Sequence, residues 1–270
     1  MEVLLNQSLL PPDLTTGVLD SSIKECVYKS GCQPIDVNEC KVSFLTSKNI
    51  MTFTEELADY IKLKAGGINA TDDDRPHVIK CELHRSKLDA NQDLGEAAFG
   101  DPSAELAWRE YHQFIDDAKM VSTMAGSRAF YIDINRVYNV IGLMLQKAGR
   151  DGMNKSVIPD RLAQYSSIMQ LHLDSGVPME ELVRGNTSIG GLMEPDFLML
   201  PAPGKKTVGD EKFYTGGYSL RRHIGFQISG FHLMLTYDVG EDAGLRKAFA
   251  EKMAEAILYW VDNYLPANFN

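Results

Sequence analysis

The segments Ala129-Phe-Tyr-Ile-Asp-Ile134 and Phe231-His-Leu-Met-Leu-Thr-Tyr237 are short, apolar-rich runs that predict the strands on which this fold is built. A third run, His77-Val-Ile-Lys-Cys-Glu-Leu83, predicts another strand. Runs of this length, rich in apolar, β-branched and aromatic residues, are typical of strands in a half-buried or buried sheet. Helical patterns lie between and after them, as in chains that cover a sheet with helices.

The helix predictions rest on signals at the helix ends. Thr52-Phe-Thr-Glu55 resembles a capping box, and the helix that it starts would end at Gly66-Gly67. Asp101-Pro102 supplies an N-cap followed by proline at the first helical position. A further helix is predicted from Arg161 to Asp174, ending at Gly176.

Two helices carry an apolar stripe, which indicates that one face packs on a core. The stripe of the helix after Pro102 consists of Leu106, Tyr111, Phe114, Ile115 and Ala118. The stripe of the last helix, which stops before Pro266, consists of Leu245, Phe249, Met253, Ile257, Trp260 and Tyr264. Trp108 and Trp260 are both predicted to be core residues.

Strands that alternate with helices of this length predict an α/β fold. We expect one domain over residues 1–270, with a mostly parallel mixed sheet and helices on both faces. Two irregular stretches, 11–50 and 201–217, are predicted to be long surface loops.

Charge and hydropathy exclude several classes of partner. A formal net charge of −10 argues against nucleic acid and against an anionic membrane surface. No apolar run approaches the ~20 residues needed to span a bilayer, and the N-terminus lacks the features of a signal peptide. We therefore expect a soluble chain with neither partner; if it is exported, its signal peptide has already been removed.

The four cysteines are concentrated near the N-terminus, at Cys26, Cys32, Cys40 and Cys81. An even number clustered in a loop is typical of disulfides, although four cysteines allow three pairings. Reduced thiols in a cytosolic protein are the alternative. A zinc site is disfavoured because the chain has no Cys-x-x-Cys pair.

Four N-glycosylation sequons also favour an extracellular protein. They begin at Asn6, Asn69, Asn154 and Asn186. Such triplets occur by chance as well, and they are modified only on exposed loops of secreted proteins. Cysteines and sequons together predict a secreted protein.

General catalytic motifs are missing from the sequence. It contains no Gly-x-Gly-x-x-Gly, Walker or Gly-x-Ser-x-Gly motif, and its six histidines form no local metal-binding spacing. Cys81 is an unpromising nucleophile because it lies inside a predicted strand.

One long segment is distinctive: Leu83-His-Arg-Ser-Lys-Leu-Asp-Ala-Asn-Gln-Asp-Leu-Gly-Glu-Ala-Ala-Phe-Gly-Asp-Pro-Ser-Ala-Glu-Leu-Ala-Trp108. It resembles the N-formylglutamate amidohydrolase-like family, particularly its longer eukaryotic branch. Matches in the same order follow at Tyr131–Asp133, Leu182–Gly185, Ser188–Gly190, Phe213–Tyr218 and Arg221–His223. The resemblance covers nearly the whole chain. It implies an α/β fold like that of zinc carboxypeptidases, with metal and catalytic groups on loops at strand ends.

The chain departs from this family at every expected metal ligand. Asn6 stands where the resemblance implies a zinc histidine, and Met51 stands where it implies a metal-binding aspartate. The third ligand is a histidine in the family, and here Asn135 takes its place. An amide oxygen is a weak ligand for zinc, whereas imidazole is a strong one.

The other catalytic positions differ too. Thr236 stands where the family has a glutamate suited to acid–base catalysis, and Gln92 stands where it has a carboxylate-binding arginine. Without zinc there is no Lewis acid and no activated water. We therefore expect no metal and no cofactor, and we expect the family's hydrolytic reaction to be lost.

The former cleft is predicted to carry a ligand-binding site. Its expected lining is Asn6, His84, Arg85, Gln92, Asp133, Asn135, Arg136, Tyr138, Arg221, His223, His232 and Thr236. Arginines suit a small anionic ligand; alternatively they pair with Asp89, Asp93 and Asp133 and hold loops. His84 and His223 fit hydrogen-bonded framework residues.

Three functions remain open from the sequence. The first is a non-catalytic binding or structural protein that uses the old cleft or its surface. The second is an enzyme with rebuilt, metal-independent chemistry on a small organic substrate, using His84, His223, His232 or Asp133. The third is an extracellular structural component that acts through its surface. The enzyme hypothesis predicts a pocket with a pair of titratable groups whose pKa values are shifted. The binding hypothesis predicts a filled cleft or a cleft without such a pair.

Overall fold

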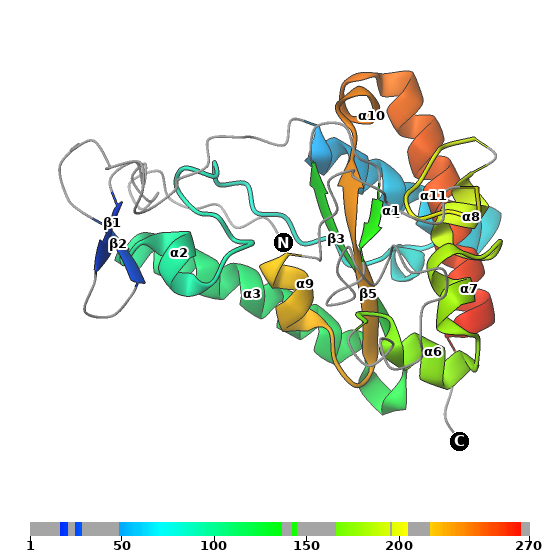
Figure 1. The fold of residues 1–270 in the computed structure, drawn as a ribbon, viewed down its shortest axis with the longest axis horizontal. Helices are drawn as coiled ribbons and strands as arrows, with labels where there is room; N and C mark the ends of the chain where they lie inside the picture. The colour runs from blue at the N-terminus through cyan, green and yellow to red at the C-terminus, as the bar shows by residue number, and fades with distance from the viewer. Residues whose placement is uncertain are drawn as a thin grey trace. The chain divides into compact units, whose positions relative to one another are not determined.

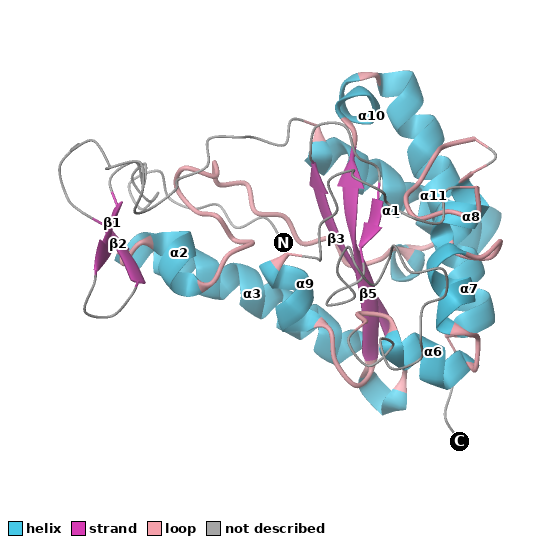
Figure 2. Ribbon diagram, in the orientation of Figure 1, coloured by secondary structure: helices cyan, strands magenta, loops and turns pink. Residues whose placement is uncertain are grey.

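The computed structural model describes residues 17–20, 25–28, 49–136, 142–144, 166–194, 196–204 and 217–265. The chain divides into two units: Met1–Thr46 with Ile79–Asp117 (unit 1), and Ser47–Val78 with Ala118–Asn270 (unit 2). This division does not test the expectation that residues 1–270 form one domain, which stays a prediction. Helices predominate over strands (Figure 2), so the chain is α/β and rich in helix.

Unit 2 is built on a mixed three-stranded sheet with the order β3-β5-β4. β3 (Ala129–Arg136) and β5 (Ile228–Leu235) are parallel, and β4 (Gly142–Met144) pairs with β5 in antiparallel fashion (Figure 1). Both strands quoted at the outset are confirmed. The second strand ends at Leu235 rather than at Tyr237, because Thr236 caps the next helix, α10 (Tyr237–Glu241).

One face of this sheet is apolar and packs on α11 (Ala243–Tyr264) and α1 (Ile50–Gly66). Side chains alternate between faces along a strand, so Phe130, Ile132 and Ile134 share this face. The ring of Phe130 lies 5.7 Å from that of Trp260 on α11. Burying such side chains contributes roughly 1.5–3 kcal/mol each, so this face is the main source of stability in unit 2.

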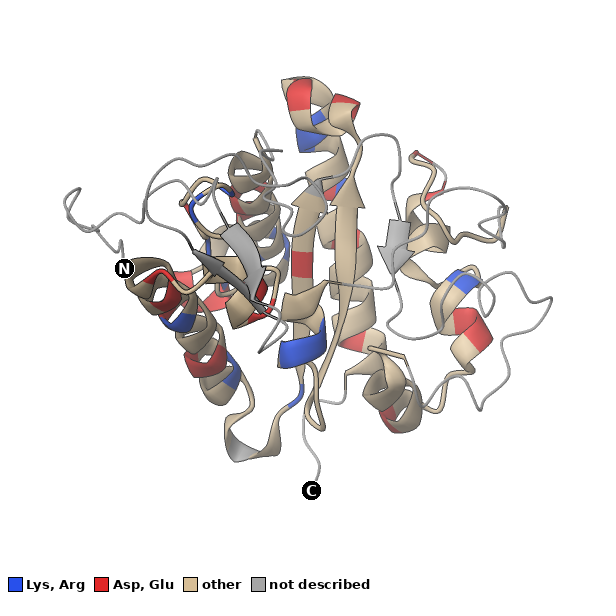
Figure 3. Cartoon of the chain, turned by 60° about the vertical axis from the view of Figure 1, so that its left-hand side comes forward, with Lys and Arg blue, Asp and Glu red and all other residues tan. Residues whose placement is uncertain are grey.

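The predicted stripe of α11 is confirmed except at its first member. The buried members are Phe249, Met253, Ile257, Trp260 and Tyr264. Leu245 is 37 % exposed, because it lies in the first turn of the helix, before the buried run begins. Figure 3 shows the charged residues mostly on the helices, as expected when helices separate core from solvent.

The described residues of unit 2 also include four further short helices. They are α6 (Met169–Ser175), α7 (Met179–Arg184), α8 (Ile189–Met193) and α9 (Tyr218–His223). The predicted stop at Gly176 is confirmed, since this residue adopts φ 68° at the end of α6. The predicted start at Arg161 lies outside the described residues. Residues 166–168 form a turn rather than helix, because the Ser166 hydroxyl accepts from the Ile168 N–H.

The start of α1 differs from the prediction and its end agrees. The helix begins at Ile50 after Asn49, so Thr52 already lies in the first turn and does not act as the N-cap. Asn49 makes no side-chain cap; its Nδ2 donates to the Gly240 carbonyl at 3.0 Å instead. The helix ends at Gly66, and Gly67 follows with φ 61°.

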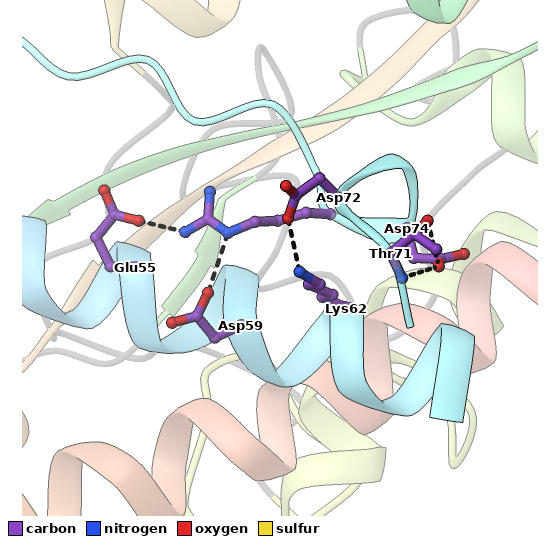
Figure 4. A network of polar contacts seen from close by, with 7 residues as sticks. Glu55, Asp59, Lys62, Thr71, Asp72 and Asp74 are labelled. Carbon is purple, nitrogen blue, oxygen red and sulfur yellow. Dashed lines mark hydrogen bonds and ion pairs between the residues drawn. The ribbon is translucent and has the colours of Figure 1, made fainter. Parts of the chain in front are cut away.

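Two short 3-10 helices, Gly67–Asn69 and Asp72–Asp74, follow α1, and a polar network joins α1 to the second of them and to Arg75 directly after it (Figure 4). Arg75 pairs with Glu55 and Asp59, and Lys62 donates to Asp72 at 2.7 Å. The Asp59 and Asp72 side chains are 69 % and 96 % exposed. Exposed ion pairs contribute roughly 0–1 kcal/mol, so this network orders the surface without dominating stability.

A buried ion pair links α1 to α11. Arg246 Nε donates to Glu56 at 2.9 Å, and the same guanidinium donates to the Gly240 carbonyl at 3.1 Å. The two side chains are only 9 % and 17 % exposed. Their pairing is therefore poorly screened, and removing one partner would leave the other charge buried.

We predict that Arg246→Ala destabilises unit 2 by about 3–5 kcal/mol, because Glu56 would keep a buried charge without its partner. Chemical denaturation followed by circular dichroism measures this difference. Lys247→Ala, at the exposed neighbouring position, is the matched control and should change the unfolding free energy by about 0.5 kcal/mol or less. Equal effects of the two variants would contradict the assigned role of Arg246.

Gly230 lets β5 approach β3 closely. A Cβ atom at this position would lie 2.1 Å from the carbonyl oxygen of Tyr131, its partner in the strand pair. The Gly230 N–H instead donates to the Ser167 carbonyl at 3.0 Å. A glycine inside a strand often marks such a close approach, and here it keeps the parallel pair intact.

Unit 1 contains a short antiparallel pair, β1 (Gly17–Asp20) and β2 (Glu25–Tyr28). This pair lies within the stretch 11–50, so the prediction of a loop throughout that stretch is wrong. The segment His77–Leu83 is the opposite case: it contains no strand, although a strand was predicted. Its apolar residues have no partner strand in the described part of the chain.

The described part of unit 1 also contains α2 (Leu94–Ala98) and the first part of α3 (Pro102–Ser122). The N-cap prediction at Asp101 is confirmed, since its Oδ1 accepts from the Ser103 and Ala104 N–H groups. Trp108 is buried as predicted. Leu106 is 56 % exposed, because the buried stripe passes through Ala104, Ala107 and Ile115 instead.

Cys81 is a free thiol. Burial raises its pKa to about 11, so it stays protonated at neutral pH and is a poor nucleophile. The side chains of the other three cysteines lie outside the described part of the structure, so disulfides among them stay a prediction.

Candidate functional site

The second face of the unit 2 sheet is polar. Tyr131, Asp133 and Asn135 share it by alternation along β3. The parallel register pairs Asp133 with His232 and Asn135 with Met234 on β5. Helices cover both faces, because α11 contacts Phe130 whereas His223 of α9 lies 5.8 Å from the Tyr131 ring.

Asp133, Asn135 and His232 form a buried cluster. Asn135 Nδ2 donates to Asp133 Oδ1 at 3.0 Å, and His232 Nδ1 lies 3.4 Å from Asp133 Oδ2. The side chains of His232 and Asp133 are 5 % and 8 % exposed. Three of the residues predicted to line the cleft are thus brought together by one strand pair.

The backbone N–H of Gly217 determines which nitrogen of the His232 imidazole carries the proton. Its N–H donates to His232 Nδ1 at 3.0 Å, which requires a lone pair on that nitrogen. The proton of the neutral ring is therefore on Nε2. Within the described ranges, His232 Nε2 and Asp133 Oδ2 are both buried without a hydrogen-bond partner.

Burial shifts the pKa values of Asp133 and His232 in the directions that disfavour their charged forms. It raises the pKa of the Asp133 carboxyl, and the nearby His232 opposes this shift. It lowers the pKa of His232, and Asp133 opposes that shift. Desolvation is the larger cause in each case, so burial opposes a charge on either group and disfavours a charged Asp133–His232 pair.

The other residues of unit 2 that were predicted to line the cleft are not part of this cluster. Thr236 accepts from the Val239 N–H and caps α10, so it does not stand in as a general base. His223 is fully buried on α9, as predicted for a framework residue, and Arg221 is exposed on the same helix. Arg136 ends β3, and its side chain is outside the described structure, as are Asn6 and Tyr138.

The predicted residues of unit 1 hold a loop. His84 Nδ1 lies 2.8 Å from the Ser86 hydroxyl, which confirms its framework role. Arg85 donates to Asp89 at 2.7 Å, so the loop-holding interpretation of this arginine is confirmed. The carbonyl of Gln92 accepts from Trp108 Nε1 at 3.0 Å.

Among the described side chains, the other two aspartates bind groups other than arginine. Asp93 caps α2 by accepting from the Glu96 N–H. The hydrogen bond observed at the Asp133 carboxylate comes from Asn135. Gly217 was missed by sequence reasoning, because a backbone N–H that binds a distant side chain leaves no local signal in a sequence.

In the parts of the chain that the structure describes, no three His, Cys, Asp or Glu side chains are grouped so that they could hold a metal ion. No described helix is long and apolar enough to cross a membrane. Comparisons of the chain with protein-family models, curated proteins and solved structures found no match.

We predict that Asp133→Asn stabilises the protein at pH 7 by roughly 1–3 kcal/mol, the cost of a buried group left unsatisfied. The folded-state pKa of Asp133 is raised, so the unfolded chain releases this proton first as the pH climbs above its ordinary value of 3.8. The contribution of Asp133 to the free energy of unfolding is fully present below pH 3.8 and is lost as the pH rises above it. The advantage of the variant should therefore grow between pH 4 and pH 7.

Thermal unfolding of the wild type, Asp133→Asn and Asp262→Asn at several pH values measures this effect. Asp262 is exposed, so its substitution is the matched control and should give a small difference that is constant with pH. A variant at Asp133 that is less stable than the wild type at pH 7 would instead indicate a charged Asp133–His232 pair.

Proposed function

We propose that this protein is a non-catalytic member of the N-formylglutamate amidohydrolase-like family that binds a small ligand on a zinc-carboxypeptidase-like scaffold. The α/β character of the chain and the motifs of residues 83–108 support this proposal. The observation that carries it is Asn135. This residue stands where the family resemblance implies a zinc histidine, and its amide donates to Asp133 within a buried cluster.

A side chain in this arrangement suits hydrogen bonding better than metal binding. The amide nitrogen of Asn135 donates to the carboxyl group, and its amide oxygen is a weak, neutral ligand for zinc. Buried polar clusters are costly unless their members are satisfied, so the cluster has a physical reason to accept a ligand. Asp133 and His232 then become binding residues rather than parts of a hydrolytic centre.

We also propose that the protein is secreted and glycosylated. Asn69 and Asn186, which begin two of the four sequons, are both exposed. Asn69 lies in the 3-10 turn after α1, and Asn186 lies between α7 and α8. Exposed positions at turns suit the attachment of a glycan.

We predict that the purified protein holds sub-stoichiometric zinc after exhaustive dialysis, and also in a parallel sample resupplied with zinc. The reason is that neutral or apolar residues replace all three expected ligands. Elemental analysis measures the metal, and formate release from N-formyl-L-glutamate measures the family's reaction, which should be absent. Asn135→His is the informative variant: it restores one ligand position and should still bind no zinc, because Asn6 and Met51 remain. One tightly held zinc per wild-type chain would refute the proposal.

A second function is favoured by one observation. An enzyme with metal-independent chemistry on a small organic substrate would need a perturbed titratable pair, and the buried Asp133–His232 pair is one. A neutral imidazole that carries its proton on Nε2 can donate a hydrogen bond to negative charge that develops on such a substrate, and the Gly217 N–H orients the ring.

Hydrolysis of p-nitrophenyl acetate separates the two functions. If the protein only binds, His232→Asn should change the rate less than about twofold, as should His77→Asn at an exposed histidine. A fall of about 10²-fold or more that is confined to His232→Asn is the effect expected for a catalytic acid or base. That result would establish the enzyme instead.

A further inference from the structure

Two buried polar atoms of unit 2 lack partners and lie close together. They are Nε2 of His232 on β5 and Oδ2 of Asp133 on β3, both without a hydrogen bond among the described residues. Their side chains are more than nine-tenths buried. An unsatisfied buried donor or acceptor costs roughly 1–3 kcal/mol, and native proteins keep few of them.

The hydrogen-bond pattern gives the two atoms complementary roles. Because the Gly217 N–H occupies Nδ1, Nε2 carries a proton and can only donate. Asn135 already occupies Oδ1 of Asp133, which leaves Oδ2 with free acceptor capacity. A group that fits here must accept one hydrogen bond and donate another.

The distance between the two unsatisfied atoms allows a single atom to contact both. Oδ2 lies 3.4 Å from Nδ1, and one ring carbon separates Nδ1 from Nε2. The two unsatisfied atoms are therefore no more than about two hydrogen-bond lengths apart. A hydroxyl oxygen accepts and donates at the same atom, so it can bridge them.

Charge disfavours an anion at this position. A carboxylate ligand would bring a second negative charge next to the Asp133 carboxylate, in surroundings where burial already opposes charge. A hydroxyl group brings no charge into the buried cluster and avoids this desolvation cost.

We propose that Asp133 and His232 form a subsite for a hydroxyl group of an uncharged small molecule, with the hydroxyl accepting from His232 Nε2 and donating to Asp133 Oδ2. This assignment rests on the proposed binding function and narrows its ligand from small anionic or organic molecules to uncharged alcohols. Asn135 and Gly217 act as positioning groups, because they occupy the other acceptor atoms of the pair.

Nuclear magnetic resonance of the full chain labelled with ¹⁵N-histidine tests the subsite. The chain has six histidines, and His232→Gln identifies the signals of His232 by their loss. We expect the Nε2-protonated tautomer at neutral pH. Ethylene glycol should shift the Nε2 signal saturably, with a Kd on the order of 10 mM, as expected for so small a ligand. The signals of exposed His77 should not follow that curve.

Two matched arms make the test decisive. Acetate, a matched carboxylate probe, should cause no saturable shift at His232, and Asp133→Asn should weaken ethylene glycol binding about tenfold because it removes the acceptor. A proton on Nδ1, tighter binding of acetate, or no saturable shift with ethylene glycol would each overturn the subsite. Metal content is measured independently, so a zinc-loaded protein would refute the proposed function without deciding the tautomer.

Discussion

The parallel pairing of β3 with β5 in one register governs the structure of unit 2. It places Ile132 beside Phe231 in the core and Asp133 beside His232 on the opposite face. Side chains alternate with a period of two, so a slip of one residue would send Asp133 into the apolar core. Gly230 supports this register, because any side chain there would collide with the Tyr131 carbonyl. The core and the polar cluster are therefore two consequences of one hydrogen-bond ladder.

The polar face is the part of the sheet that packing does not explain. A sheet that is covered on both faces usually has apolar residues on both. This face instead carries the carboxyl group of Asp133, the amide of Asn135 and the imidazole of His232. The chain satisfies some of their atoms through Asn135 and Gly217 and leaves two unsatisfied. Sites where local rules are broken without internal compensation are where function is expected. These unsatisfied atoms support a binding role for the cluster, and burial, which opposes charge there, favours an uncharged ligand.

The charged residues of unit 2 act differently according to their burial. The network at the end of α1 is exposed, so water and salt screen it (Figure 4). Arg246 and Glu56 are shielded by the two helices that they join, and their pairing matters more for that reason. Asp133 and His232 are still more buried, and burial opposes a charge on either of them. The degree of burial therefore separates screened surface ion pairs, one shielded ion pair and a buried pair in which charge is disfavoured.

The sequence by itself determined the elements whose signals are local. Apolar runs predicted β3 and most of β5, glycines predicted the ends of α1 and α6, and spacing predicted the buried face of α11. Only the tertiary structure decided which runs pair with another strand. His77–Leu83 has the sequence pattern of a strand and pairs with no described strand, whereas part of the predicted loop at 11–50 forms β1 and β2. It also selected Asp133, Asn135 and His232 from a longer set of candidates. The physical reason is that periodicity and end signals act over a few residues, whereas strand register and hydrogen bonds such as that from Gly217 to His232 join segments that fold together only in space.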